Sequence, residues 1–124
     1  MSVHSINRIL RALATLNDLK VNASLTQTRA LLIIMAREGI NQHQVQDLLK
    51  TNSATAHRSI ALWKYWEREP DPSKNYKGIR GANLVSAEVD PDDTRSRLLI
   101  LSPLGKIIRQ QIIEDIGNGG TTRK

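Results

Sequence analysis

The alternation of hydrophobic and polar positions predicts a mainly α-helical chain with one short β-hairpin. A first helix is expected from His4 to Lys20, because apolar residues recur there at steps of three and four. A second helix, capped by Thr26 and ended by Gly39, contains a continuous apolar run that should be buried on most sides. Ser102 and Pro103 start a last helix, as an N-cap followed by a proline at the first helical position. The apolar positions of the first and last helices are Ile6, Ile9, Leu10, Leu13, Leu16 and Leu19, and Leu104, Ile107, Ile108, Ile112 and Ile113.

Two further helices in the middle of the chain have the layout of a helix-turn-helix. Asn41 can cap a short helix that carries Val45, Leu48 and Leu49 inward. The segment 51–53 then offers a turn and a new N-cap, and the next helix is expected over residues 53–68. Its apolar stripe is Ala56, Ile60, Trp63 and Trp66, and Thr55, His57, Arg58 and Ser59 project away from that stripe.

A β-hairpin with a charged tip is predicted before the last helix. Two strand-like runs, residues 84–89 and 98–101, flank the polar octet from Asp90 to Arg97. The whole hairpin covers residues 83–101 and has the form of a wing. Pro70 and Pro72 end the preceding helix, and residues 73–81 have the composition of a loop. That loop carries the evenly spaced basic residues Lys74, Lys77 and Arg80.

Composition favours a single basic domain with a polyanionic partner. The 124 residues carry a formal net charge of +6, and a sequence pI of about 10.1 suits nucleic acid or an acidic surface. No signal peptide or membrane-spanning apolar stretch is evident, so a cytoplasmic protein with no membrane partner is expected. The compact size would suit a bacterium or a virus that acts in a bacterial host.

The same inventory predicts no enzyme, no metal site and no cofactor. The chain has no cysteine, which excludes disulfides, thiolate zinc sites and cysteine nucleophiles. It also has no glycine-rich phosphate cradle and no Ser/His/Asp arrangement in a recognisable turn. The three histidines lack the spacing of metal ligands. The aspartates at 90, 92 and 93 lack the glycine and distal glutamate of a calcium loop.

The helix-turn-helix and the hairpin together predict contact with double-stranded DNA. The major groove admits one α-helix, and short polar side chains and arginine in its first turns can reach base edges. An arginine on a hairpin can enter the minor groove, where the negative potential is strong. The candidate contacts are Ser53, Thr55, His57 and Arg58 on the helix, Lys50 and Asn52 for phosphate, and Arg95 and Arg97 on the wing. Lys74, Lys77 and Arg80 either extend the phosphate contact or belong to a mobile connector.

The order of these motifs resembles that of MarR-type winged helix-turn-helix transcription regulators. The resemblance covers roughly residues 26–105 and is carried by residues 40–41, 45–49, 54–58, 83–85, 90–95 and 101–105. Its most specific part is Asp93 and Arg95, two apart at the wing, followed after a strand by a Leu-Ser/Thr-x-x-Gly helix start. The resemblance implies a homodimer whose first and last helices interlock, with reading helices in successive major grooves and wings in flanking minor grooves. The function expected first is therefore that of a sequence-specific regulator that represses by promoter occlusion. It also implies that Asp93 orients Arg95 through a charge-assisted hydrogen bond.

Read in this way, residues 1–117 form a single winged-helix domain. Residues 1–24 are the N-terminal dimerisation helix, residues 25–102 the DNA-binding core, residues 103–117 the C-terminal helix, and residues 118–124 a disordered tail. The chain departs from the resemblance at Gln46 and Lys50, where alanine and glycine are usual, and in the basic insert at 69–81. The C-terminal region is also short.

Three alternatives stay open at this point. The fold could serve as a protein-interaction module or inhibitor of a nucleic-acid machine, in which case the first and last helices meet a different chain. It could also bind DNA without sequence preference. Trp63 and Trp66 are expected to anchor the core, the alternative being that they line a pocket for a small-molecule effector, which the sequence does not otherwise indicate.

Overall fold

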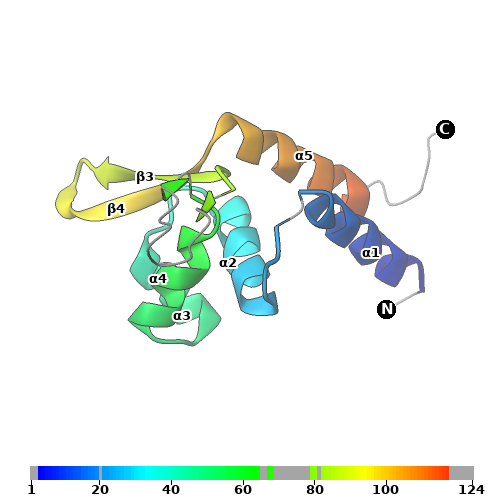
Figure 1. The fold of residues 1–124 in the computed structure, drawn as a ribbon, viewed down its shortest axis with the longest axis horizontal. Coiled ribbons are helices and arrows are strands. Elements are labelled where there is room, and N and C mark those ends of the chain that lie inside the picture. The colour runs from blue at the N-terminus through cyan, green and yellow to red at the C-terminus, as the bar shows by residue number, and fades with distance from the viewer. Residues whose placement is uncertain (1–2, 20, 65–66, 69–78, 81, 118–124) are drawn as a thin grey trace, which may run out of the picture.

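The chain folds into five helices and two small antiparallel sheets, as described for residues 3–19, 21–64, 67–68, 79–80 and 82–117 of a computed structural model (Figure 1). The elements are α1 (Val3–Asn17), α2 (Leu25–Ala36), α3 (Gln42–Leu49), α4 (Ser53–Ala61), β1 (Glu67–Arg68), β2 (Ile79–Arg80), β3 (Val85–Asp90), β4 (Asp93–Leu101) and α5 (Pro103–Gly117). The predicted class, mainly α with a winged helix-turn-helix and flanking terminal helices, is confirmed. The predictions for Trp66, Pro70, Pro72, Lys74, Lys77 and the tail 118–124 lie outside the described residues.

The second helix starts two residues earlier than the sequence predicted. Ser24, not Thr26, is the N-cap, because Ser24 and Gln27 form a reciprocal capping box. The Ser24 hydroxyl accepts from the Gln27 N–H at 3.1 Å, and the Gln27 carboxamide accepts from the Ser24 N–H at 2.7 Å. The helix also ends at Ala36, before Gly39, which has a φ of +99°.

The predicted cap Asn41 is confirmed, and within the segment 51–53 the residue that caps the second helix is Asn52. Asn41 caps α3 in a capping box with Gln44, and the Asn52 Oδ1 accepts from the backbone N–H of Thr55 at 2.8 Å at the start of α4. Lys50 ends α3 in the left-handed conformation, with a φ of +56°. The prediction that Leu48 points inward is wrong. Its side chain is 40% exposed, because only Val45 and Leu49 face the core from this short helix.

Helix α4, predicted to be the reading helix, is shorter than expected and ends at Ala61 instead of residue 68. After Ala61 the backbone turns to pair with the segment before the wing. The Trp63 carbonyl accepts from the N–H groups of Leu84 and Val85 at 2.7 and 2.9 Å, and a helical continuation would lose these bonds. The predicted loop at 73–81 also contains a strand, since β2 pairs with β1 in the register Glu67–Arg80 and Arg68–Ile79.

The wing is an antiparallel ribbon with a tip shorter than the predicted octet. Strands β3 and β4 pair from Val85–Leu101 to Asp90–Asp93, so only Pro91 and Asp92 connect them. Thr94 to Arg97 belong to β4. The register shifts between the Val89–Arg97 pair and the Asp90–Asp93 pair. The three β4 residues between these pairs, Thr94 to Ser96, have no paired residue on β3.

The start of α5 is held tightly to the base of the wing. Ser102 caps the helix as predicted: its hydroxyl accepts from the Gly105 N–H at 2.9 Å and donates to the Asn83 carbonyl at 2.7 Å. Gly105 packs directly on the backbone of Leu84. A side chain at position 105 has no room there, which is the physical reason for glycine in this motif.

Glu38 links the end of α2 to both β4 and α5. Its carboxylate accepts from the Leu101 N–H at 2.9 Å and from an Arg109 guanidinium nitrogen at 3.2 Å. The Leu101 N–H, with Arg109 and Lys106, holds the pKa of the Glu38 carboxyl below its ordinary value of 4.5, against the opposing effect of burial.

The core lies where α2, α3, α4, the wing base and α5 meet. Its buried members include Ala30, Leu31, Ile34, Val45, Ile60, Trp63, Leu84, Val85, Leu99, Leu101 and Ile112. Helix α1 packs mainly against α5, at the opposite end of the molecule from the wing and α3–α4 (Figure 1).

Candidate nucleic-acid interface

The first turns of α4 present most of the predicted reading residues. Ser53, His57 and Arg58 are exposed and Thr55 is half-buried, with an Arg58 guanidinium nitrogen 3.4 Å from the Thr55 hydroxyl. Ser59 does not project outward as predicted. It is buried, because it follows Ala56 by three residues and so shares the core-facing side of the helix.

Lys50 and Asn52 precede α4 and are both exposed. The side chain of Asn52 already holds the start of α4 through its cap, and Lys50 is fixed by its left-handed backbone. The N-terminus of α4 therefore combines a capped helix end with a neighbouring ammonium group. Such a helix end favours a bound anion such as phosphate.

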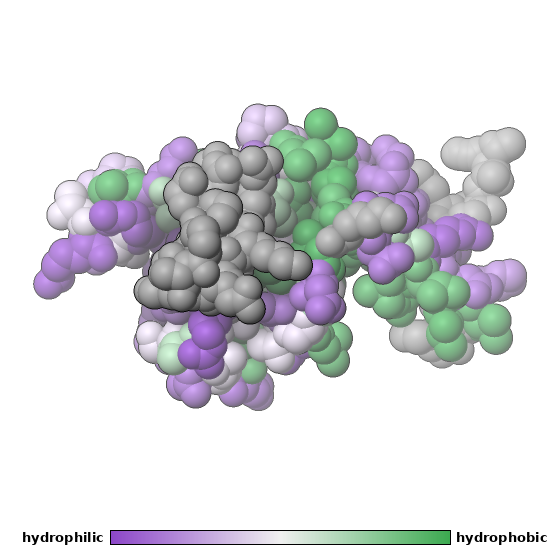
Figure 2. Space-filling model, in the orientation of Figure 1, coloured by the Kyte–Doolittle hydropathy of each residue, from purple (hydrophilic) through white to green (hydrophobic). Residues whose placement is uncertain are grey.

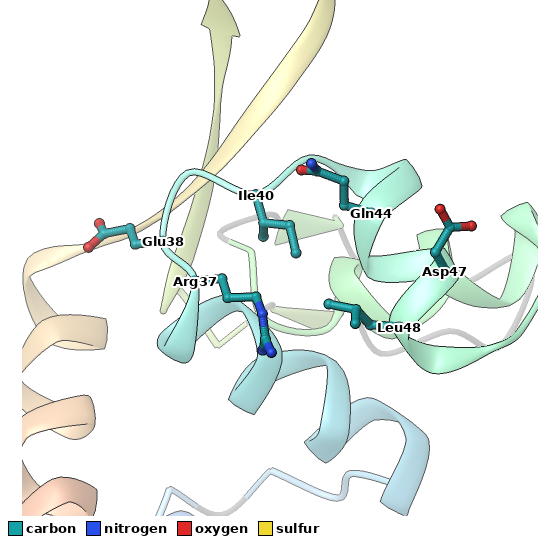
Figure 3. Close-up of a pocket in the computed structure, with 6 residues that line it drawn as sticks. All are labelled: Arg37, Glu38, Ile40, Gln44, Asp47 and Leu48. Carbon is teal, nitrogen blue, oxygen red and sulfur yellow. The ribbon is translucent and has the colours of Figure 1, made fainter.

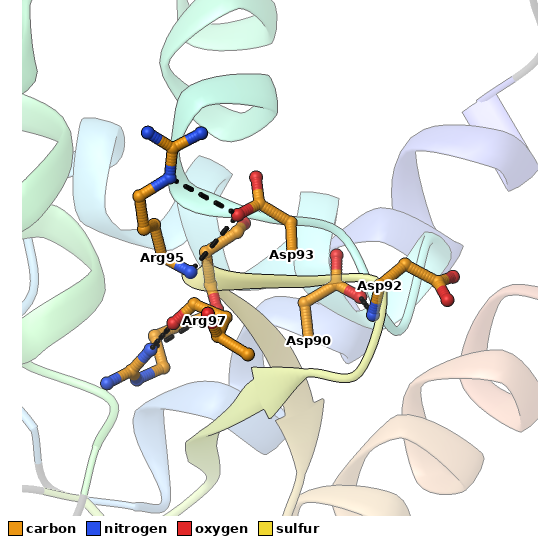
Figure 4. A network of polar contacts seen from close by, with 7 residues as sticks. Asp90, Asp92, Asp93, Arg95 and Arg97 are labelled. Atoms are coloured by element: carbon orange, nitrogen blue, oxygen red, sulfur yellow. Dashed lines mark hydrogen bonds and ion pairs between the residues drawn. The ribbon is translucent and has the colours of Figure 1, made fainter.

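The wing brings Asp93 and Arg95 together (Figure 4). The Asp93 Oδ1 accepts from the backbone N–H of Arg95 at 3.1 Å and lies 3.6 Å from the Arg95 Nε. The Arg95 side chain is 93% exposed and that of Asp93 52% exposed. The aspartate thus fixes the backbone at Arg95 through a hydrogen bond, and the longer contact between the side chains is an ion pair that water screens.

The other charged residues of the wing are also held locally. The Arg97 guanidinium donates to the carbonyls of Thr94 and Ser96 at 3.2 and 3.3 Å, along the irregular part of β4. At the tip, the Asp90 carboxylate accepts from the Asp92 N–H at 2.9 Å and closes the turn (Figure 4). Of the basic insert, the backbone of Arg80 lies in β2, and Lys74 and Lys77 lie outside the described residues.

A groove between the wing and α3 was missed by the sequence reasoning. It has a volume of about 340 Å³, and its lining includes Gln42, His43, Lys64, Arg95 and Arg97. The sequence gives no local signal for this set, because its members come from three segments that only the packing of α3 against β4 places together. Lys64 in particular was expected to lie inside a longer helix.

Other hollows lie elsewhere on the described residues. One of about 490 Å³ lies at the junction of α2 and α3 and is lined by Arg37, Glu38, Ile40, Gln44, Asp47 and Leu48 (Figure 3). None of these residues was predicted to contact DNA. A smaller one, of about 150 Å³, adjoins Trp63. Trp63 itself is buried, and its indole N–H donates to the Gln27 carbonyl at 2.7 Å, so it anchors the core as expected.

Neither a metal site nor a membrane span is found in the described part of the chain. Its His, Asp and Glu residues form no group of three or more that could hold a metal ion. Its helices include none that is both long and apolar enough to cross a membrane.

The fold is shared with solved transcription regulators. A MarR transcriptional regulator from Methanosarcina mazei Go1 is 19% identical, with a TM-score of 0.57 over 90% of this chain and 67% of that one. The Staphylococcus aureus MepR–DNA complex is 15% identical, with a TM-score of 0.60 over 88% and 75%. The transcriptional repressor CouR, bound to a 23-mer DNA duplex, is 16% identical, with a TM-score of 0.53 over 94% and 69%.

These likenesses establish the architecture. The chain has the winged-helix fold of MarR-type transcription regulators, as its motifs predicted. In sequence, no protein-family model and no curated protein matches it.

Proposed function

We propose that this chain is a dimeric, sequence-specific DNA-binding regulator that represses transcription by occluding a promoter. The observation that carries the proposal is the pairing of an exposed polar first turn on α4 with a wing whose Arg95 backbone is fixed by Asp93. Both elements lie at the same end of the molecule (Figure 1). The DNA-bound states of MepR and CouR, which share the fold, support this assignment. The action is assigned to the cytoplasm of a bacterium or of a bacterial host of a virus.

In this proposal each candidate residue has a separate task. Thr55, His57 and Arg58, with Ser53, face the major groove, where short polar side chains and arginine read base edges. Lys50 and Asn52 hold phosphate beside the N-terminus of α4. Arg95 enters the minor groove, and Arg97 contacts the backbone beside it.

The dimer is proposed from the exposed apolar residues of α1 and α5. A soluble domain seldom leaves so many large aliphatic side chains in water on two adjoining helices. Figure 2 shows an apolar surface over α1, at the end of the molecule remote from the wing. The exposed residues are Val3, Ile6, Ile9, Leu10 and Leu13 of α1, and Leu104, Ile107, Ile113 and Ile116 of α5. A second copy that packs its own α1 and α5 against them would bury both sets.

One experiment tests class, specificity and assembly together. Duplexes are selected from a random pool at moderate salt, and the mass of the protein in solution is recorded. We expect a pseudo-palindromic consensus with half-sites about one helical turn apart, and twice the 13.9 kDa chain mass. The affinity should be nanomolar and should fall by about 0.9 log units per log unit of salt for each phosphate contact.

The same apolar faces favour one second candidate, a protein-interaction module that binds a different chain. A monomeric mass, with no selected duplex, would support that candidate over the regulator. A dimer that binds duplexes but returns no consensus would point instead to sequence-neutral DNA binding.

A further inference from the structure

The wing has two chemically different faces. Side chains alternate along a strand, and on β4 Arg97 precedes the buried Leu99 and Leu101 on the same face. On β3, the neighbours of Ala87 in sequence, Ser86 and Glu88, lie on the opposite face. The arginine face of the wing is therefore a continuation of the core face, turned toward the body of the protein.

The groove of about 340 Å³ lies on this arginine face. Its lining comes from the first residues of α3, from Lys64 beyond the end of α4, and from β3 and β4. Its lining residues are Asn41, Gln42, His43, Lys64, Ala87, Arg95, Ser96, Arg97 and Leu99. Among the lining residues that the structure describes, none is acidic. The groove therefore joins three permanent cations, a histidine and two amide side chains with the apolar residues Ala87 and Leu99.

The described ion pairs of the groove residues leave two of its cations without a carboxylate partner. Asp93 is 3.6 Å from the Arg95 Nε, and Asp47 is 3.6 Å from the His43 Nε2 on the side of α3. Lys64 and Arg97 have no carboxylate partner among the described residues. Two cations that lack a described carboxylate partner suit a polyanion, and each DNA strand carries about one negative charge per 3.4 Å.

Lys64 is rigidly positioned for such a contact. Its carbonyl accepts from the Asn83 N–H at 3.3 Å, its N–H donates to the Ala61 carbonyl at 3.2 Å, and its backbone forms a β-bridge with Val85. The residue thus sits where α4, the wing and the groove meet. Because its backbone is tied to both DNA-facing elements, an anion that it binds has a defined position relative to both.

We propose that this groove, between α3 and the wing, seats the sugar–phosphate backbone of one DNA strand. Lys64 and Arg97 contact its phosphates from one side, and Gln42 and His43 from the other. The proposal rests on the proposed function and adds to it a sequence-neutral contact that sets the register of α4 and the wing on the duplex.

The test compares Lys64→Gln with Lys106→Gln, which removes an exposed lysine on α5. Binding of the full chain is measured against salt on the selected duplex and on a random duplex. For Lys64→Gln, the log–log salt slope should fall by about 0.9, the loss of one phosphate contact, and both duplexes should weaken by the same factor. Lys106→Gln should keep the wild-type slope, and Lys64→Arg should restore it.

The outcomes separate the groove from the wider function. If the wild type binds duplex with a steep salt slope and Lys64→Gln does not change it, the groove proposal is overturned and the regulator proposal stands. If the wild type binds no duplex, both are overturned. A loss confined to the selected duplex would assign Lys64 to base reading, which also contradicts the groove. Thermal unfolding of each variant establishes that it is folded.

Discussion

Replacing Gly105 with alanine should destabilise the fold sharply, because the first turn of α5 lies against the backbone of the wing base. A Cβ built at this position collides with the Leu84 carbonyl oxygen, with the Leu84 carbonyl carbon at 3.1 Å and the Leu101 Cβ at 3.2 Å. The colliding atom is main chain, and the Leu84 carbonyl also accepts from the Ser102 N–H at 2.9 Å, so it cannot move without losing that bond. Relief of the clash requires α5 to shift.

The expected net effect is a loss of stability of about 1–3 kcal/mol. Overpacking of a tight contact costs about this amount or more, and the gain in helix propensity on replacing glycine by alanine, at most about 1 kcal/mol, offsets only part of it. For a chain of this size the melting temperature should fall by roughly 3–15 °C. Thermal unfolding followed by circular dichroism measures it.

Gly117→Ala provides the matched control, because it makes the same substitution in the same helix. A Cβ at position 117 meets nothing within 4 Å, so this variant should melt within about 2 °C of the wild type. The reasoning would be refuted if Gly105→Ala were as stable as Gly117→Ala, since the helix would then tolerate a side chain at its contact with Leu84.

Three further predictions address the turn, the ionic link and the wing. Lys50→Gly should be more stable than Lys50→Ala by about 0.5–1 kcal/mol in urea unfolding, because only glycine adopts the φ of +56° without strain; equal stabilities would contradict this. The lowered pKa of Glu38 stabilises the fold above pH 4.5, and this contribution is lost as the pH falls from 4.5 through the lowered pKa. Glu38→Gln should therefore lower the free energy of unfolding by about 1–3 kcal/mol at neutral pH. Below pH 4.5 its stability should depend less steeply on pH than that of the wild type. An unchanged pH dependence would show that Glu38 does not stabilise the fold in this way. Arg95→Ala should weaken binding to the selected duplex, measured by fluorescence anisotropy, by about 1–3 kcal/mol. Asp93→Asn should weaken it by less, since an amide oxygen can still accept from the Arg95 N–H. A larger loss of affinity for Asp93→Asn than for Arg95→Ala would contradict these roles.

Local signals predicted most of the helices and their caps. Asn41, Asn52 and Ser102 act within three residues of their own position, so their role can be read from the sequence alone. The error at the start of α2 is also local. Ser24 and Thr26 both carry a hydroxyl that can cap a helix, and Ser24 is the cap because it forms a capping box with Gln27.

Features that depend on distant pairing were not predictable in this way. The end of α4 is set by the bonds from Leu84 and Val85 to the Trp63 carbonyl, some twenty residues away in the chain. The groove beside Lys64 has the same origin. The candidate site was accordingly predicted where it consists of single elements, the first turn of α4 and the tip of the wing, and missed where two elements meet.

The junction at Ser102 has a mechanical consequence. One hydroxyl holds both the Asn83 carbonyl at the base of β3 and the Gly105 N–H in the first turn of α5, and β4 runs directly into that helix (Figure 1). Hinge motion between ribbon and helix would break these bonds, so α5 acts as a lever that carries the wing with it. In a pair of copies joined through α1 and α5, the separation of the two wing tips is then dictated by helix packing at the far end. A duplex with a different half-site spacing must bend or twist to be bound, at an elastic cost that depends on its sequence.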